Sequence, residues 1–233
     1  MISQSMRPGT ARMLLAAAVV AAGLAASSAW YVSRAHALDD RGAQVAHHHA
    51  ESPAVGRPEL SGFAAVSREE VGQHVVAPAF HLVDQAGAAV SLDDLKGRTV
   101  LISFLYTNCP EACPLLTGNY LQLQKEFAEA IRKENLALVL ITTDPERDTP
   151  SWLEDYTRWL EAKWLFLTGD EAMLEPVWRE YEVYREVHQE KQDIVIYHSY
   201  RTYLLDPAGA MRVKYTGVWQ TETVAADISK ILE

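Results

Sequence analysis

The sequence is poor in basic residues and in cysteine. Its 233 residues contain 21 Lys and Arg against 31 Asp and Glu, which gives a formal net charge of −10. An acidic surface repels phosphate, and the chain has no basic run or stacking platform, so we expect no nucleic acid partner. Apolar residues make up 48% of the chain, which is enough to bury the core of one good-sized domain with an appendage.

The N-terminal segment has the pattern of an export signal. Two arginines precede an apolar stretch from Met13 to Ala26, after which the chain becomes small and polar. If the apolar segment continues through Val32, it covers about 20 residues and can span a bilayer, with its basic side in the cytoplasm. The alternative is a signal that is cleaved near Ala37, in the small-x-small sequence 35–37.

These patterns divide the chain into three parts. Residues 1–37 are the membrane anchor or signal, residues 38–75 are a flexible linker rich in Ala, Gly, Pro, Ser and His, and residues 76–233 are a folded domain. We expect the domain in the periplasm or at the outer face of a bacterial-type inner membrane, tethered or, after cleavage, secreted. His47–His49 in the linker can capture Cu or Zn weakly, or can simply be a solvated run.

The domain alternates predicted strands with predicted helices. Strands alternating with helices indicate an α/β fold with a mostly parallel sheet covered on both faces, and the final strand pair adds an antiparallel edge. This is a thioredoxin-like plan with a mixed sheet flanked by helices. The expected strands are 80–84, 90–92, 100–106, 136–142, 164–167, 194–205 and 211–215, and the expected helices are 93–97, 116–131, 150–162, 170–182 and 221–232.

Cys109 and Cys113 lie directly after the buried strand 100–106. In an exported protein, two cysteines commonly form a structural disulfide. Their position instead favours a metal or redox site, because loops at that end of parallel strands bind ligands in α/β sheets. Residues four apart on a helix have Cβ atoms about 5–6 Å apart, so the sulfurs can converge on one ion or form a disulfide. Pro110 suits the first helical position, which would place Cys109 where the helix dipole favours thiolate.

The chemistry of a pair of thiolates favours a soft metal. Two thiolates suit Cu(I), and an added imidazole also allows Cu(II), whereas structural zinc requires four ligands. His74 and His81 precede the core strand, His188 lies in a polar segment that we expect to be a loop, and His198 lies in a strand that can hold it rigidly. A strand histidine is more often a satisfied core residue, and spacing alone does not select the third ligand.

Segments in a fixed order carry a family resemblance. They are the Cys-Pro-x-x-Cys-Pro segment 109–114, Asp-Pro-Glu-Arg-Asp-Thr-Pro at 144–150, Phe-Leu-Thr-Gly at 166–169, and His198-Ser199 followed by Tyr-Leu-Leu-Asp at 203–206. Together they resemble the SCO/SenC family, copper-handling proteins with a thioredoxin-like fold and usually a membrane tether. The similarity covers roughly Pro78 to Leu232.

This resemblance implies a copper site made by Cys109, Cys113 and His198. It also implies a metallochaperone that delivers copper to the copper-bearing subunit of cytochrome c oxidase or to another copper or thiol protein. The alternative is a thiol–disulfide oxidoreductase in which Cys109 and Cys113 are redox-active, whereas a peroxide-reducing enzyme has no support in the sequence. The family usually has Asp just before the histidine, where this chain has Tyr197. Since a carboxylate there could orient the ring or raise its basicity, the change bears on copper affinity more than on the ligand set.

The segment 144–149 has a second interpretation. Asp144 could lie near the cysteines because it also follows a core strand, but Arg147 with Asp148 or Glu146 could equally form a surface ion pair that stiffens a loop. We favour the structural interpretation. We likewise expect the tryptophans at 152, 159 and 164 to be core or cover residues.

Overall fold

The computed structural model describes residues 66–72, 75–109, 113–190 and 193–233. The predicted signal or anchor, His47–His49 and His74 lie outside these ranges. None of the helices within them has the length and apolarity that a bilayer crossing requires.

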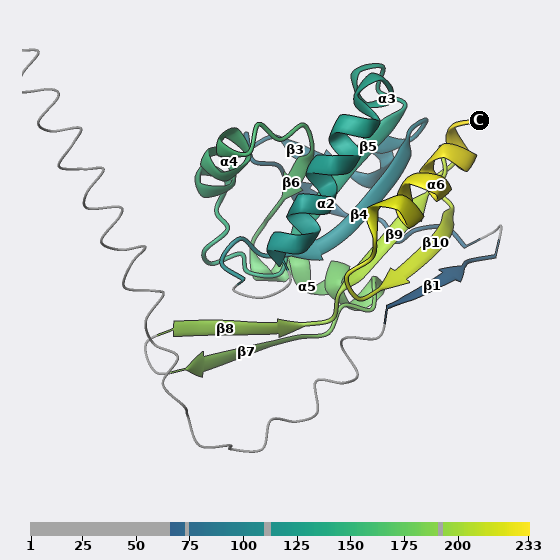
Figure 1. The fold of residues 1–233 in the computed structure, drawn as a ribbon. Coiled ribbons are helices and arrows are strands. Elements are labelled where there is room, and N and C mark those ends of the chain that lie inside the picture. The colour runs from purple at the N-terminus through teal and green to yellow at the C-terminus, as the bar shows by residue number, and fades with distance from the viewer. Residues whose placement is uncertain (1–65, 73–74, 110–112, 191–192) are drawn as a thin grey trace, which may run out of the picture. The chain divides into compact units, whose positions relative to one another are not determined.

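The described domain is built on one six-stranded sheet, in which β4, β5 and β6 are parallel and β9 runs antiparallel beside β4 (Figure 1). This mixed sheet agrees with the predicted α/β plan. Across the sheet the strands are β1 (Ser67–Glu70), β10 (Met211–Thr216), β9 (Arg201–Leu205), β4 (Thr99–Leu105), β5 (Leu136–Thr142) and β6 (Leu165–Leu167).

The two central strands are buried on both faces, because every residue of β4 and β5 is buried. Successive side chains of a strand point to opposite faces, so β4 feeds two separate cores. Leu101 and Leu105 belong to one core, while Ile102 and Phe104 belong to the other. This explains why the sequence shows a continuous apolar run here rather than alternation.

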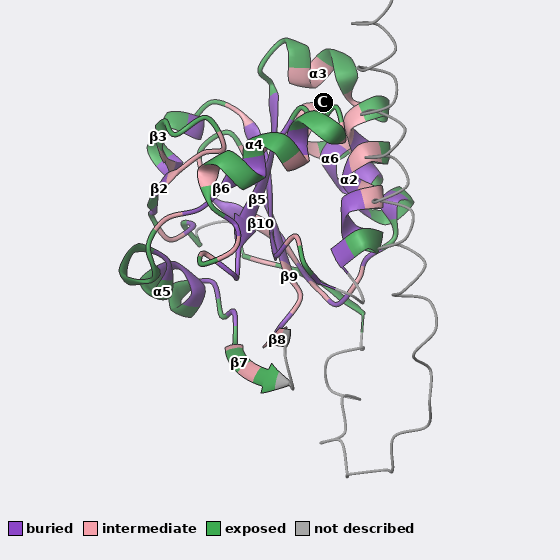
Figure 2. Ribbon diagram, turned by 90° about the vertical axis from the view of Figure 1, so that its left-hand side faces the viewer, coloured by how far each residue is buried: buried purple, intermediate pink, exposed green. Residues whose placement is uncertain are grey.

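Helices and a small hairpin cover the two faces (Figure 2). Residues of α2 and α6 line one core, and residues of α5 and the β2–β3 hairpin line the other. These elements are β2 (His81–Val83), β3 (Ala89–Ser91), the 3-10 helix η2 (Leu92–Leu95), α2 (Cys113–Glu126), α3 (Ala128–Arg132), α4 (Pro150–Trp159), α5 (Glu171–Glu180) and α6 (Thr221–Leu232).

The local signals predicted most helix and strand positions. β5 and α6 have the predicted bounds, and α4 begins as predicted, with Pro150 at its first position and the Thr149 side chain accepting a hydrogen bond from the Trp152 amide (3.4 Å). The helix expected over 116–131 consists of α2 and α3.

The structure differs from the sequence prediction in two places. Residues 67–70, which the sequence analysis assigns to the linker, form the edge strand β1 beside β10. The single strand expected over 194–205 is two strands, β8 (Asp193–His198) and β9, and β8 pairs with β7 (Arg185–Glu190), where we expected a loop. The β7–β8 hairpin extends from the end of the sheet (Figure 1).

Candidate metal centre

The sheet topology brings the cysteine loop and His198 to the same end of the molecule. β9 is antiparallel to β4, with Ser103 opposite Thr202. The end of β4 therefore lies beside the start of β9. Cys109 follows β4 and His198 precedes β9, so both lie at the same end of the sheet. Cys113 and His198, which are 85 positions apart in the chain, meet because of this one strand pairing.

The described geometry contains a direct contact between Cys113 and His198. Their Sγ and Nε2 atoms are 4.0 Å apart. With bonds of about 2.3 Å to sulfur and 2.0 Å to nitrogen, as for zinc, two ligands of one ion at a trigonal angle lie about 3.7 Å apart. The two atoms are therefore close to the separation that a shared ion requires.

The imidazole of His198 is oriented for binding through Nε2. Its Nδ1 atom lies 3.3 Å from the carbonyl oxygen of Ser199. A carbonyl can only accept a hydrogen bond, so Nδ1 carries the proton and the lone pair of Nε2 faces Cys113. The ring is packed between Tyr106 and Tyr200, at centroid distances of 5.7 and 4.9 Å.

Burial keeps His198 neutral. The side chain lies in the interior, and desolvation of the imidazolium lowers the pKa of His198 to about 4. Neutral imidazole is the form that binds metals. The histidine is therefore ready to act as a ligand at neutral pH without first losing a proton.

Both cysteines are buried thiols, with exposed fractions of 8% for Cys109 and 3% for Cys113. A hydrogen bond with Cys109 and then burial raise the pKa of Cys113 well above its usual range. The raised pKa keeps the Cys113 thiol protonated. A helix start would instead lower the pKa of a cysteine and favour the thiolate. The predicted N-cap position of Cys109 depends on Pro110, which lies outside the described residues.

The three predicted ligands are neighbours, but they do not surround a common point. In the ranges that the structure describes, no three His, Cys, Asp or Glu side chains are arranged to hold a metal ion. Cys113 contacts His198 and interacts with Cys109, so it links the other two. Enclosing an ion would require the side chains to adjust from these positions.

The other described candidate histidines have different surroundings. His188 lies on β7, where Nε2 is 3.0 Å from Glu186 and the ring packs edge-on against Tyr197 at 4.9 Å. His81 is exposed on β2, within the hairpin that covers the other core. Tyr197, the residue just before His198, therefore contacts the hairpin histidine His188.

The segment after β5 is more deeply buried than a surface ion pair. Asp144 and Asp148 are both buried. Arg147 pairs with Asp144, not with Asp148 or Glu146 as the sequence suggested, and its guanidinium lies 5.7 Å from the centre of the Tyr106 ring. The expectation that this segment is an exposed ion pair is wrong, although a structural ion pair does exist within it.

Asp148 is a residue of the site that the sequence interpretation missed. It accepts hydrogen bonds from the amide and hydroxyl groups of Thr107, in the cysteine loop, and from the hydroxyl of Thr142. Burial raises the pKa of Asp148 to about 6 against the opposing effect of these bonds. The sequence contained one sign of this role, because Asp148 is an acidic residue shortly after a core strand. The same feature suggested that Asp144 could lie near the cysteines.

The tryptophan predictions are only partly confirmed. Trp164 is buried, whereas Trp152 and Trp159 are 47% and 79% exposed. Trp152 still contacts the site region, because its Nε1 donates a hydrogen bond to the Thr107 hydroxyl (2.8 Å). Its exposed ring therefore adjoins the loop that carries Cys109.

Comparison with known proteins gives consistent matches. A family model described as SCO1/SenC matches residues 68–233. A SCO2-like protein of Rickettsia conorii is 37% identical over 135 residues, which cover 56% of this chain and 64% of that protein. The chain thus spans slightly less than two thirds of the length of this relative.

Solved structures of Sco proteins also match this chain. Bradyrhizobium japonicum ScoI with copper bound is 30% identical with a TM-score of 0.58, covering 67% of this chain and 99% of that one. Yeast Sco1 with copper bound is 28% identical with a TM-score of 0.55, covering 67% of this chain and 87% of that one. Each of these two thioredoxin-like neighbours was solved with copper.

Proposed function

This chain belongs to the SCO1/SenC family, and from that premise we propose that it is a copper metallochaperone that binds copper through Cys109, Cys113 and His198. The observation that carries the proposal is the contact of 4.0 Å between Cys113 Sγ and the lone-pair nitrogen of His198. The copper-bound neighbours support copper as the ion. Copper is cargo here, taken up from one protein or pool and passed to another.

The three proposed ligands suit a copper ion that the protein must first bind and later release. Sulfur ligands favour Cu(I), and the imidazole extends the set toward Cu(II). Because the Cys113 thiol holds its proton strongly, metal uptake must displace that proton, and reprotonation would favour release. A set of three ligands also leaves room for an incoming ligand of the acceptor.

We propose the copper-bearing subunit of cytochrome c oxidase as the acceptor, as the family resemblance implies. We further propose that the domain acts in the periplasm or at the outer face of the membrane, attached through residues 1–37 and the linker. The relatives include a mitochondrial SCO2 homologue of Bos taurus and a SCO1/SenC family lipoprotein of Bacillus anthracis. Of these two names, that of the lipoprotein supports a membrane-associated setting.

A second candidate function is thiol–disulfide exchange with the acceptor's cysteines. The interaction between the Cys109 and Cys113 thiols favours it. In this reaction one thiolate attacks a target disulfide, and the second thiol displaces the target thiol from the mixed disulfide. The chain ends with a disulfide, and the target ends with two thiols. The raised pKa of Cys113 suits it to the resolving role rather than to the first attack.

Copper titration of reduced wild-type chain and of two histidine variants tests the main proposal. We expect about one copper ion per wild-type chain. His198→Ala should weaken Cu(II) binding by more than the 10–100-fold that loss of a mere outer-shell partner causes. His188→Ala is the matched control, since His188 contacts Glu186 and Tyr197 instead. Its affinity and absorption spectrum should equal those of the wild type.

The outcomes separate the two functions. If His198→Ala keeps wild-type copper affinity and spectra, the ligand assignment is wrong. A wild-type chain that loses copper to a mild chelator but reduces disulfide substrates rapidly would support thiol–disulfide exchange instead.

A further inference from the structure

The loop that carries Cys109 is attached to the neighbouring strand through one buried carboxylate. Asp148 is fully buried, at 0% exposed. It accepts hydrogen bonds from the Thr107 amide (3.2 Å) and hydroxyl, and from the Thr142 hydroxyl (2.6 Å). Thr142 is the last residue of β5, so the carboxylate joins the loop after β4 to the end of β5.

The donors around Asp148 specify a carboxylate. Its side chain accepts hydrogen bonds from an amide N–H and two hydroxyl groups, and an ionised carboxylate is an acceptor with enough lone pairs for all three. An asparagine would present an NH₂ group to some of the same donors, and an NH₂ group cannot accept a hydrogen bond. The nearby cation does not take this role, because Arg147 pairs with Asp144 and donates to the carbonyl of Ile194 (3.0 Å).

Thr107 is held from its other side by Trp152. The Thr107 hydroxyl donates to Asp148 and accepts from Trp152 Nε1 (2.8 Å), so both of its hydrogen-bonding roles are filled and its rotation is fixed. Trp152 lies in the first turn of α4, whose N-cap Thr149 directly follows Asp148. The short segment 148–152 therefore fixes Thr107, which lies two positions before Cys109.

We propose that Asp148 is a positioning residue for the copper site, and that it acts by fixing Thr107 and hence the place where Cys109 meets Cys113 and His198. The inference rests on the proposed function, in which these three residues are the copper ligands. Metal and catalytic groups must be held to within about 0.5 Å of their working geometry by such supporting hydrogen bonds. Asp148 does not touch the ion in this proposal.

The test compares Asp148→Asn, Thr107→Val and Thr107→Ser with the wild type. Asp148→Asn and Thr107→Val should each lower copper affinity about 10–100-fold, the usual effect of losing an outer-shell partner. Both should also shift the sulfur-to-copper absorption band of the Cu(II) complex. Thr107→Ser keeps the hydroxyl and should restore affinity and spectrum to near the wild-type values. Thr107→Val gives a result even if Asp148→Asn fails to fold.

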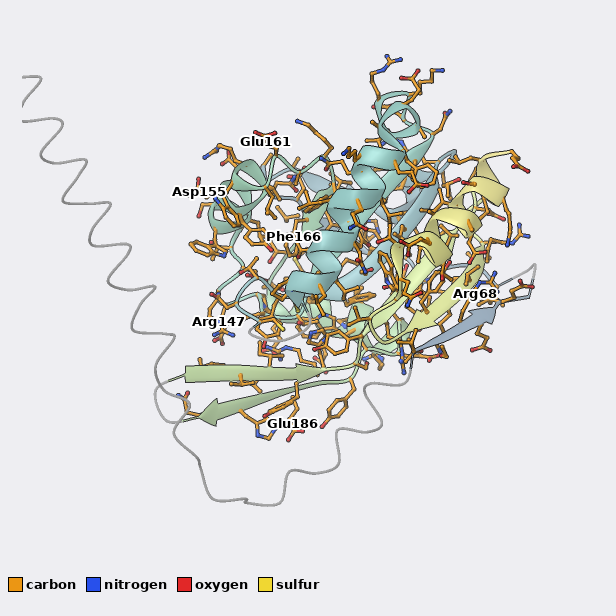
Figure 3. The ribbon with its side chains drawn as sticks, in the orientation of Figure 1. Arg68, Arg147, Asp155, Glu161, Phe166 and Glu186 are labelled. Carbon is orange, nitrogen blue, oxygen red and sulfur yellow. The ribbon has the colours of Figure 1, made fainter. Side chains whose placement is uncertain are left out.

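Asp227→Asn is the matched control, because Asp227 is a second buried carboxylate held by hydrogen bonds. Its partners are Arg68, Tyr215 and Lys230. Figure 3 labels Arg68 beside β1, on the opposite side of the view from Arg147. This variant should lose stability yet bind copper like the wild type. If Asp148→Asn and Thr107→Val also lose only stability, with unchanged affinity and spectrum, the positioning proposal is overturned.

A second measurement separates this proposal from the proposed function. If the wild type itself binds no copper, the copper function fails, and the positioning role is then measured by the rate at which oxidised glutathione converts Cys109 and Cys113 into a disulfide. A rate changed at least about threefold in Asp148→Asn and Thr107→Val, but not in Thr107→Ser or Asp227→Asn, would support positioning of the thiols. Equal rates in all the variants would overturn it.

Discussion

At the scale of single residues, hydrogen-bonded side chains join β4 to β9. They thereby hold together the two parts of the site, which are the cysteine loop after β4 and His198 before β9. Ser103 of β4 and Thr202 of β9 share a hydrogen bond of 2.6 Å in the middle of the sheet. The Tyr120 hydroxyl donates to Ser103 (2.9 Å), and Trp219 Nε1 donates to Thr202 (2.9 Å). A buried network in which every member has a partner is stable, but the loss of one member is costly.

Thr202→Val should therefore destabilise the domain by about 1–3 kcal/mol, because it leaves the buried Trp219 N–H without its acceptor. Urea unfolding of the apo chain measures this change. Thr216→Val is a suitable control, since the Thr216 hydroxyl accepts from the partly buried Arg201 (3.1 Å) at the end of β10 and should matter less. Equal losses in the two variants would contradict the central role of the network.

At the scale of elements, β1 shows how a short exposed strand is fixed to the sheet. All of its residues are exposed, so burial contributes little to its attachment. Arg68 instead donates two hydrogen bonds to Asp227 of α6, at 2.6 and 2.9 Å. Burial raises the pKa of Asp227, but the hydrogen bonds from Arg68, Tyr215 and Lys230 outweigh it and lower the pKa to about 2.

The lowered pKa makes the attachment of β1 dependent on pH. A carboxyl group whose folded-state pKa lies below the unfolded value of about 3.9 stabilises the fold above that pH and loses this effect as the pH falls toward 2. Asp227→Asn should thus cost about 1–2 kcal/mol at pH 7, after allowance for solvent screening at the partly exposed Arg68. The difference from the wild type should shrink between pH 5 and pH 3 in urea titrations.

Glu129→Gln is the control for this pH effect. Glu129 pairs with Arg132 and Lys133 on the surface, with a side chain 61% exposed, and exposed pairs contribute about 0–1 kcal/mol. A stability difference for Asp227→Asn that stays constant from pH 7 to pH 3 would show that the ion pair does not hold β1.

For the whole molecule, copper binding and folding are linked. A ligand that binds only the folded state at a free concentration of 100 Kd adds about 2.7 kcal/mol of stability. We expect buffered copper at that level to raise the free energy of unfolding of the wild type by this amount. His198→Ala should gain less at the same free copper concentration. No copper-dependent change in the wild-type unfolding midpoint would contradict specific binding to the folded domain.

Much of the fold could be predicted because the central strands give strong local signals. The apolar runs 100–106 and 136–142 correspond to β4 and β5, and the Thr149-Pro150 start predicted α4. The β7–β8 hairpin could not be predicted in the same way, because its half-exposed strands mix Glu186, Val187 and His188 without a clean apolar face. Its attachment depends on tertiary contacts of Arg185, which donates to the Thr143 carbonyl (2.6 Å) and lies 4.6 Å from the Trp178 ring centre.

The candidate site was predictable to a similar degree. The resemblance selected His198, and the structure places it against Cys113, while its role as a ligand stays a prediction. Asp148 was missed because its contact with Thr107 joins two loops that are separate in the chain. The sequence suggested Asp148 or Glu146 as the partner of Arg147, whereas the folded backbone brings Arg147 to Asp144.

The pairing of β4 with β9 also determines when the candidate site can form. Ser103 and Thr202 are 99 positions apart, so the contact closes a long loop, which is a slow step in folding. A chain emerging from its N-terminus first presents both cysteines well before the strand that follows His198. During that interval the thiols do not have the histidine beside them, so a chain whose thiols are oxidised before this strand pairs would reach the folded state without free thiols for copper.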